Sequence, residues 1–258
     1  MAITVDFCAS NNSGSSTSTI TATNLNSGAA NDWFVVLVAA DNAGTRGVSS
    51  ISAVSDTSGN TYTHRGTVNY TGLAANDGVT IAVFAGEITT TFSTNTFTAT
   101  FSPNTTCKTI TVYRVRPTST YDIIFNTFGA GATGNSANPT ITSDSITSGH
   151  LIFGFAGAES SDLWTQDADT SNGTWSTAVL EKRNGGTQDT SITSVAQYKI
   201  TTGTATQTFN PTHGSAYDYA INWASFYEIV VTALTATGVA TGNPSVGSPA
   251  ITQVHVAV

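Results

Sequence analysis

Short runs of this chain alternate apolar and polar residues, as in TITATN (19–24) and TFTATF (96–101). Other runs are continuously apolar, such as WFVVLVAA (33–40). The runs are separated by Gly, Asn, Ser and Pro, and they are rich in the Thr and Val that suit a pleated surface. No apolar period of 3.6 residues is sustained, so helix has little support. The pattern predicts an all-β protein.

Blocks of the first half recur in the same order in the second half, although the loops between them differ in length. The pairs are TITATNLNSG (19–28) with TITSDSITSG (140–149), DWFVVLVAAD (32–41) with HLIFGFAGAE (150–159), DTSGNTYT (56–63) with DTSNGTWS (169–176), IAVFAGEIT (81–89) with TSVAQYKIT (193–201), TFTATFSP (96–103) with TATQTFNP (204–211), and ITVYRV (110–115) with ASFYEI (224–229). The shared order indicates two tandem modules, at residues 1–118 and 119–231. Each is expected to be an antiparallel β-sandwich of roughly eight strands. This strand count favours a jelly roll over an immunoglobulin-like fold.

The link and the tail differ from the modules. RPTSTYD (116–122) joins the modules so closely that we expect them to pack side by side. Residues 232–258 match neither module and cannot form a core of their own. We predict an extended C-terminal arm, containing Gly and Pro, that crosses a neighbouring surface or adds a strand to it. The arm residues expected to make assembly contacts are Pro244, Val246, Pro249 and Ile251.

Charged residues make up only 9% of the chain, and the formal net charge is −8. Eight scattered basic residues cannot form a phosphate-binding stripe, so neither nucleic acid nor an anionic membrane is expected as a partner. No apolar run reaches the roughly 20 residues that span a bilayer. The first residues, MAITVDFCAS, contain no basic region and no long apolar run. We therefore expect no signal peptide and synthesis in the cytoplasm.

The repeated DTS octets admit two interpretations. Gly and Asn tolerate the positive φ of a tight hairpin turn, after which Tyr62 or Trp175 would begin a strand and pack inward. Alternatively, Asp167, Asp169 and Ser171 alternate like the oxygen ligands of a calcium loop. The distal bidentate Glu is missing, and the first module has no counterpart of Asp167. The hairpin turn is preferred, and calcium at Asp167 and Asp169 stays open.

Two cysteines occur, Cys8 and Cys107, and no CxxC motif. Buried free thiols are the preferred interpretation, because cytoplasmic synthesis disfavours disulfides. A bridge between neighbouring first and last strands of one sandwich stays open.

No catalytic motif is present: the chain has no GxSxG elbow, phosphate loop or dinucleotide fingerprint. Histidines are spread over both modules and the arm, at His64, His150, His213 and His255. A glycosidase needs two facing carboxylates, but the glutamates fall in different predicted strands, at Glu87, Glu159, Glu181 and Glu228. We expect a protein without catalysis and without a cofactor.

Aromatic side chains are the remaining candidates for a contact surface. Three tryptophans lie inside alternating strand patterns and are expected in the core: Trp33, Trp175 and Trp223. Trp164, in the acidic loop SSDLWTQDAD, is the best candidate for an exposed contact. Tyr217 and Tyr219, in HGSAYDYA, come second.

The run ISAVSDTSGNTYTHRG (51–66), the next apolar strand and TFTATFSP (96–103) resemble a recurrent β-sandwich module of phage structural proteins and some bacterial surface proteins. The marks of that module are a D-x-x-G-N-T-[YW] hairpin and a later V-Y-x-[VI] strand, here VYRV (112–115). The arm segment ATGVATGNPSVGSPAITQVHV (236–256) is similar to Gly-Pro-rich segments of phage virion proteins. The resemblance implies a structural role and supplies no catalytic residues.

The expected function is that of a phage virion protein without catalysis, a capsid decoration or cement protein. Its partners would be the major capsid protein or other virion proteins, and by analogy it would form a homo-oligomer, with a trimer favoured. Two alternatives stay open: a tail or head-fibre protein that contacts host glycans, and a secreted carbohydrate-binding module.

Overall fold

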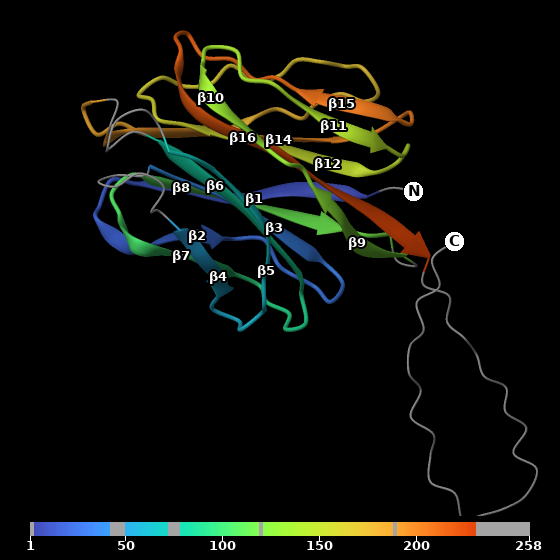
Figure 1. Ribbon diagram of the computed structural model, residues 1–258. Coiled ribbons are helices and arrows are strands. Elements are labelled where there is room, and N and C mark those ends of the chain that lie inside the picture. Colours follow the sequence, from blue (N-terminus) through green and yellow to red (C-terminus); the bar gives the residue numbers. More distant parts are fainter. Residues whose placement is uncertain (1–2, 42–49, 72–77, 119–120, 188–189, 231–258) are drawn as a thin grey trace, which may run out of the picture.

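The computed structural model describes residues 3–41, 50–71, 78–118, 121–187 and 190–230, which form β-strands joined by loops (Figure 1). The strands are β1 (Thr4–Ser13), β2 (Thr17–Asn24), β3 (Trp33–Asp41), β4 (Ser50–Asp56), β5 (Thr63–Tyr70), β6 (Val79–Glu87), β7 (Asn95–Thr105), β8 (Lys108–Arg116), β9 (Tyr121–Phe128), β10 (Ala132–Ser136), β11 (Ile141–Ile146), β12 (Leu151–Ala158), β13 (Val179–Arg183), β14 (Ile192–Ile200), β15 (Ala205–Phe209) and β16 (Tyr217–Val230). The all-β antiparallel class is confirmed. Within the described ranges no helix is long and apolar enough to cross a membrane. The predicted arm at 232–258, with its four named contact residues, lies outside the described residues.

The first module is a sandwich of a five-stranded sheet, in the order β1-β8-β3-β6-β5, and a three-stranded sheet, in the order β2-β7-β4. The pairing is nested, since β1 pairs with β8, β2 with β7 and β3 with β6, all antiparallel. This is the jelly-roll pattern. The smaller sheet alternates buried and half-buried side chains along β7, as expected for a sheet with one face in water.

The second module repeats this plan. Its large sheet has the order β10-β16-β12-β14-β13, and β9 pairs with the other end of β16. The strands β9 and β10 together therefore replace β1, and β16, β12, β14 and β13 replace β8, β3, β6 and β5. Strands β11 and β15, the counterparts of β2 and β7, form the small sheet. The matched sequence blocks that form strands thus occupy equivalent strands.

Strand β4 has no strand counterpart in the second module. All of residues 159–178 are described, and they form a loop. One isolated antiparallel β-bridge, between Thr165 and Thr212, pairs this loop with the segment before β16. The small sheet of this module consequently has two strands, and the outer edge of β15 faces a loop. This difference shapes the candidate site described below.

The large sheets of the two modules pack face to face and enclose the broadest apolar cluster of the described chain (Figure 1). Its larger members from the first module are Leu37, Ile81, Val83 and Tyr113, and from the second module Phe153, Phe155, Ile192 and Phe226. Each large sheet is covered on both faces, because its other face packs on the small sheet of its own module. Strands β3, β6, β8 and β12 are accordingly buried along almost their whole length. The described chain therefore has four β-layers, with the large sheets in the middle.

The contact between the modules is reciprocal. Strand β13, the counterpart of β5, lies over β1 and β8, while β16, the counterpart of β8, lies over β5 and β6. Strand β12 lies over β3 and β6, and β14, the counterpart of β6, lies over β3. Such reciprocal pairing is the geometry of an isologous dimer, here within one chain. The modules are in contact, as their short link predicts, and the contact is made by sheet faces.

Both cysteines are free thiols. Cys8 lies at the bulge of β1 opposite Tyr113 and Val112, whereas Cys107 directly precedes β8. At about 3.3 Å per residue the two are separated by about 17 Å along β8, far beyond the roughly 7 Å between Cα atoms that a disulfide can bridge. Burial raises the pKa of both thiols, that of Cys107 to about 11. The expected free thiols are confirmed, although only Cys107 is buried and Cys8 is half-buried.

A close approach of β12 to β3 and β6, at Gly157, provides a test of the central core. A Cβ on Gly157 of β12 would lie 2.9 Å from Ile81 Cγ2 and 3.0 Å from Ala39 Cβ. We expect Gly157→Val to force the sheets apart and to lower the free energy of unfolding by about 1–3 kcal/mol. Urea denaturation followed by tryptophan fluorescence measures this change.

The control is Gly214→Ala, since a Cβ at Gly214 meets nothing within 4 Å. This variant should unfold like the unmodified protein. Because the modules share their core, all three proteins should unfold in one cooperative transition. Two resolved transitions, or an unchanged midpoint for Gly157→Val, would contradict the shared core.

Candidate functional site

Trp164 is buried, with 3% of its surface exposed, so the prediction that it forms an exposed contact is wrong. Its ring packs on His213, with ring centroids 3.6 Å apart. Two backbone hydrogen bonds between Thr165 and Thr212, of 2.7 and 2.9 Å, hold this loop against the segment before β16. The loop takes the place of a strand, and Trp164 covers the core that the strand would otherwise cover. The neighbouring Leu163 is the exposed apolar residue, at 50%.

Tyr217 and Tyr219 lie at the start of β16 and are half-buried against the core of the second module. The Tyr217 hydroxyl donates a hydrogen bond to Asp162. This hydrogen bond, together with burial, raises the pKa of Tyr217. The Tyr217 ring also meets the His213 ring edge-on, with centroids 5.4 Å apart. His213 therefore contacts both Tyr217 and Trp164. A role of these tyrosines in contacts stays a prediction.

Two of the three tryptophans expected in the core are buried, Trp175 and Trp223. Trp33 is half-buried at the edge of the central core, under the guanidinium group of Arg65 at 5.5 Å. None of these rings forms an exposed stacking platform.

In the first DTS octet, backbone and side-chain groups of the octet donate hydrogen bonds to its aspartate, Asp56. Asp56, at the end of β4, accepts hydrogen bonds from the Ser58 N–H (2.9 Å), the Tyr62 hydroxyl (2.7 Å) and Asn95 Nδ2 (2.7 Å). Asn60 donates twice, from its backbone N–H (3.0 Å) and its Nδ2 (2.9 Å). Burial raises the pKa of Asp56, but these hydrogen bonds outweigh it and leave the pKa below the ordinary value. The first octet is a structural clamp.

The second octet is a more open loop that precedes β13. Asp169 accepts a hydrogen bond from the Ser171 N–H (2.9 Å), and its Oδ2 lies 3.7 Å from Lys199 Nζ. The Lys199 ammonium is buried over the ring of Trp175, 4.7 Å from the centroid. The turn itself is made by Asn172, with φ of 54°, and Gly173, with φ of 116°. Trp175 packs inward as expected, but it lies in this loop and does not begin a strand, since β13 starts at Val179.

Asp167 and Asp169 engage donors in a way that does not suit a calcium site. Asp167 is 3% exposed, and its two carboxylate oxygens accept the backbone N–H groups of Asp169 (2.7 Å) and Asn210 (2.9 Å). Asp169 faces Ser171 N–H and the ammonium of Lys199. Both oxygens of Asp167 are therefore engaged with N–H groups, and the positive charge of Lys199 beside Asp169 repels a cation. Within the described ranges no group of three or more metal-binding side chains occurs.

A polar pocket of about 320 Å³ opens between the second octet and the outer edge of β15. Its lining residues are Asp169, Ser171, Asn172, Thr206, Gln207, Thr208 and Asn210. We call it the Asp169 pocket. Strand β15 and its partner β11 form the outermost layer of the second module, so the pocket lies on the outside of the molecule (Figure 1).

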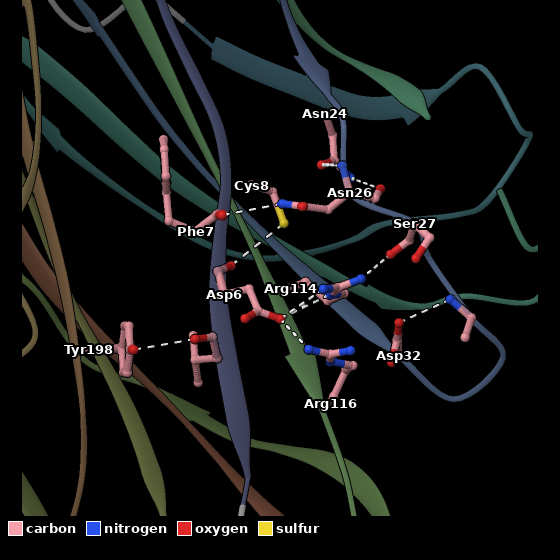
Figure 2. A network of polar contacts seen from close by, with 12 residues as sticks. Asp6, Phe7, Cys8, Asn24, Asn26, Ser27, Asp32, Arg114, Arg116 and Tyr198 are labelled. Carbon is pink, nitrogen blue, oxygen red and sulfur yellow. Dashed lines mark hydrogen bonds and ion pairs between the residues drawn. The ribbon is translucent and has the colours of Figure 1, made fainter. Parts of the chain in front are cut away.

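A second polar cluster lies at the edge of the first module (Figure 2). Asp6 Oδ2 accepts hydrogen bonds from Arg114 Nη2 (2.9 Å) and Arg116 Nη2 (2.8 Å). Arg114 also donates to the carbonyl oxygen of Ser27. The cluster ties β1 to β8 and to the loop after β2. Because one carboxylate pairs with both guanidinium groups, the cluster holds the edge strand β1 against β8.

The glutamates considered for catalysis are also engaged structurally. Three of them accept hydrogen bonds from the first module or the link: Glu159 from Gly78 N (2.7 Å), Glu181 from Asn12 Nδ2 (2.8 Å) and Glu228 from Thr118 N (3.0 Å).

No protein-family model matches this chain, and neither a curated protein nor a solved structure is significantly similar to it. Sequence reasoning missed the pocket residues Asn172, Thr206, Gln207, Thr208 and Asn210. A signal was available, because the aligned block TFTATFSP has alanine, Ala99, where TATQTFNP has Gln207.

The two octet aspartates are predicted to differ in their contribution to stability. Asp56→Ala leaves buried amides and a hydroxyl without their acceptor, and should lower the free energy of unfolding by about 3 kcal/mol. Asp169→Ala removes one backbone hydrogen bond and the 3.7 Å ion pair with the buried Lys199, which keeps the Ser171 carbonyl as an acceptor (3.2 Å), and should cost about 1–2 kcal/mol. Urea denaturation of both variants measures the difference. Equal losses would show that the second octet is as closed as the first.

His213 predicts a specific loss of stability in mild acid. Burial lowers its pKa from 6.5 to about 4. Between these values the unfolded chain binds a proton that the folded chain does not, so stability falls as the pH decreases from 6.5 to about 4. The loss attributable to His213 is at most about 3 kcal/mol.

His213→Phe keeps the ring that packs on Trp164 and removes the titration, so it should lose less stability over the same range. His64→Gln is the control, because His64 is exposed, and it should follow the unmodified protein. Urea midpoints at several pH values decide the outcome. An equally steep loss in His213→Phe would rule out His213 as the cause.

Proposed function

We propose that this chain is a non-catalytic structural protein of a phage virion, and specifically a capsid decoration protein that binds the outer shell. The observation that carries the proposal is the four-layer body, in which two jelly-roll-like sandwiches share one apolar core. Jelly rolls occur in viral capsid domains and also in lectins, so the fold alone is an analogy. The resemblance of the octet and arm segments to phage structural modules favours a capsid protein over a lectin.

The hydrogen bonds and ion pairs of five carboxylates support a role without catalysis. Asp56 and Asp167 hold loops, Asp6 ties an edge strand, and Glu159 and Glu181 bind groups of the first module. These acids act as structural acceptors, which suits a rigid body that must keep its shape on a particle.

Attachment is assigned to the C-terminal arm together with the exposed edge of the first module. Strand β1 is an edge strand of its sheet and carries Phe7, which is 47% exposed. The loop after β2 carries Leu25, which is 78% exposed. Burial of these two apolar side chains against a partner would stabilise the attachment. In this proposal the partners are the major capsid protein, other virion proteins or sister subunits, with a trimer favoured, and the protein is located in the virion.

Removal of the arm tests the proposal. The full chain should co-sediment saturably with phage capsids from which the protein has been removed. A truncated chain ending at Val230, the last residue of β16, keeps every described strand. It should bind at least about tenfold more weakly, a loss of about 1.4 kcal/mol or more.

A second variant keeps the arm but carries serine at its four predicted contact residues, and it should behave like the truncated chain. Cryo-electron microscopy of complete particles locates the protein independently. Equal binding by the truncated chain would overturn the assignment to the arm. Density confined to the tail or fibres would overturn the decoration function and favour host adsorption.

A further inference from the structure

The Asp169 pocket lies where the first module has a strand. In the first module β4 pairs with β7 over residues 97–102. The aligned segment of the second module, 205–210, carries the pocket residues of β15, and no strand covers its outer edge. The loop that replaces β4 approaches this edge through Asp169 and Asn172. A pocket has therefore formed at the position where the other copy of the repeat has a paired strand.

The side chains that close the first octet are missing from the second. Asp56 is enclosed by the side chains of Asn60, Tyr62 and Asn95. The aligned residues of the second module are Gly173, Trp175 and Gly203. Two have no side chain, and Trp175 donates its indole N–H to the carbonyl of Thr208 (3.2 Å).

The carboxylate of the second octet therefore opens to the pocket. The side chain of Asp169 is 33% exposed, and Asp169 lines the pocket wall.

Gln207 adds an unpartnered acceptor to the pocket wall. It is 2% exposed, and among the described residues its Oε1 has no hydrogen-bond partner, while its Nε2 donates to the carbonyl of Ala205 (2.9 Å). A buried polar group left without a partner costs about 1–3 kcal/mol. The aligned residue of the first module, Ala99, is apolar and carries no such cost. A ligand that donates a hydrogen bond to Oε1 would remove the cost.

The chemistry of the lining selects the ligand class. The wall offers a carboxylate, three amides and three hydroxyls, all from polar residues. Asp169 and the net charge of −8 disfavour an anion, and Lys199 beside Asp169 reduces the need for a cation. A neutral molecule with several hydroxyl groups can donate to the acceptors and accept from the amides at once. A volume of about 320 Å³ is at the small end for ligand pockets.

We propose that the Asp169 pocket binds one ring of a neutral saccharide. The ring hydroxyls donate to Gln207 Oε1 and the Asp169 carboxylate and accept from the amide of Asn172, whereas the amide nitrogen of Asn210 is directed at Asp167. The inference goes beyond the proposed function, because a saccharide pocket on the outer layer does not depend on how the protein attaches to a particle.

The test uses the purified full chain and an array of immobilised neutral mono- and oligosaccharides, followed by calorimetric titration with the saccharides that bind. Two variants restore the residue of the first module. Gln207→Ala removes the unpartnered oxygen, and Gly203→Asn places a side chain against the pocket residue Asn172, because a Cβ at Gly203 would lie 2.8 Å from Asn172 Oδ1. Each should weaken saccharide binding at least about tenfold without lowering the unfolding midpoint, and Gln207→Ala can raise the midpoint.

A matched pair controls for the position in the repeat. Thr206→Ala changes the pocket wall and should weaken binding, whereas Thr98→Ala changes the aligned residue of the first module and should not. The inference is overturned if no saccharide on the array binds. It is equally overturned if binding occurs but is unchanged in all three pocket variants. Capsid co-sedimentation is measured separately, so failure of this inference and failure of the proposed function are distinguishable.

Discussion

The apolar contact between the two large sheets is the constraint on which the rest of the structure depends. Tyr113 of β8 illustrates it: the ring meets Phe153 of the other module at 5.2 Å, and its hydroxyl donates to the carbonyl of Ala196 (3.2 Å). Because each large sheet is covered on both faces, neither module could expose its inner sheet without exposing a continuous apolar surface. The two modules are therefore parts of one body, although the chain builds them in tandem.

This constraint explains where the two copies stayed alike and where they diverged. The large sheets face each other reciprocally, so a change in either one affects the shared core. Their strands correspond in order, with β9 and β10 together in the place of β1. The small sheets face outward and have no such requirement. Strand β4 is consequently present in one copy and replaced by a loop in the other, and the Asp56 clamp is closed while the Asp169 loop is open. The Asp169 pocket accordingly lies at the small outer sheet of the second module, where the shared core does not restrict the residues.

The polar groups follow the same division. Toward the interface and the rims, carboxylates such as Glu159 and Glu181 accept hydrogen bonds and stiffen the body. On the outer layer of the second module, Asp169 and Gln207 line a pocket. A rigid body with chemistry confined to its surface suits a structural protein that attaches to an assembly and presents a face to its surroundings.

The sequence by itself determined the all-β class, the repeat and the inward packing of Trp175 and Trp223, because alternation and turn residues are local properties of a strand. It did not determine the burial of Trp164, the separation of Cys8 and Cys107, the face-to-face contact or the pocket. The acids around Trp164 indicate an exposed loop. In the structure this loop packs on the core of the second module, at the position where the first module has β4. Which face of an element is covered depends on residues far away in the chain, so only the tertiary structure decides it.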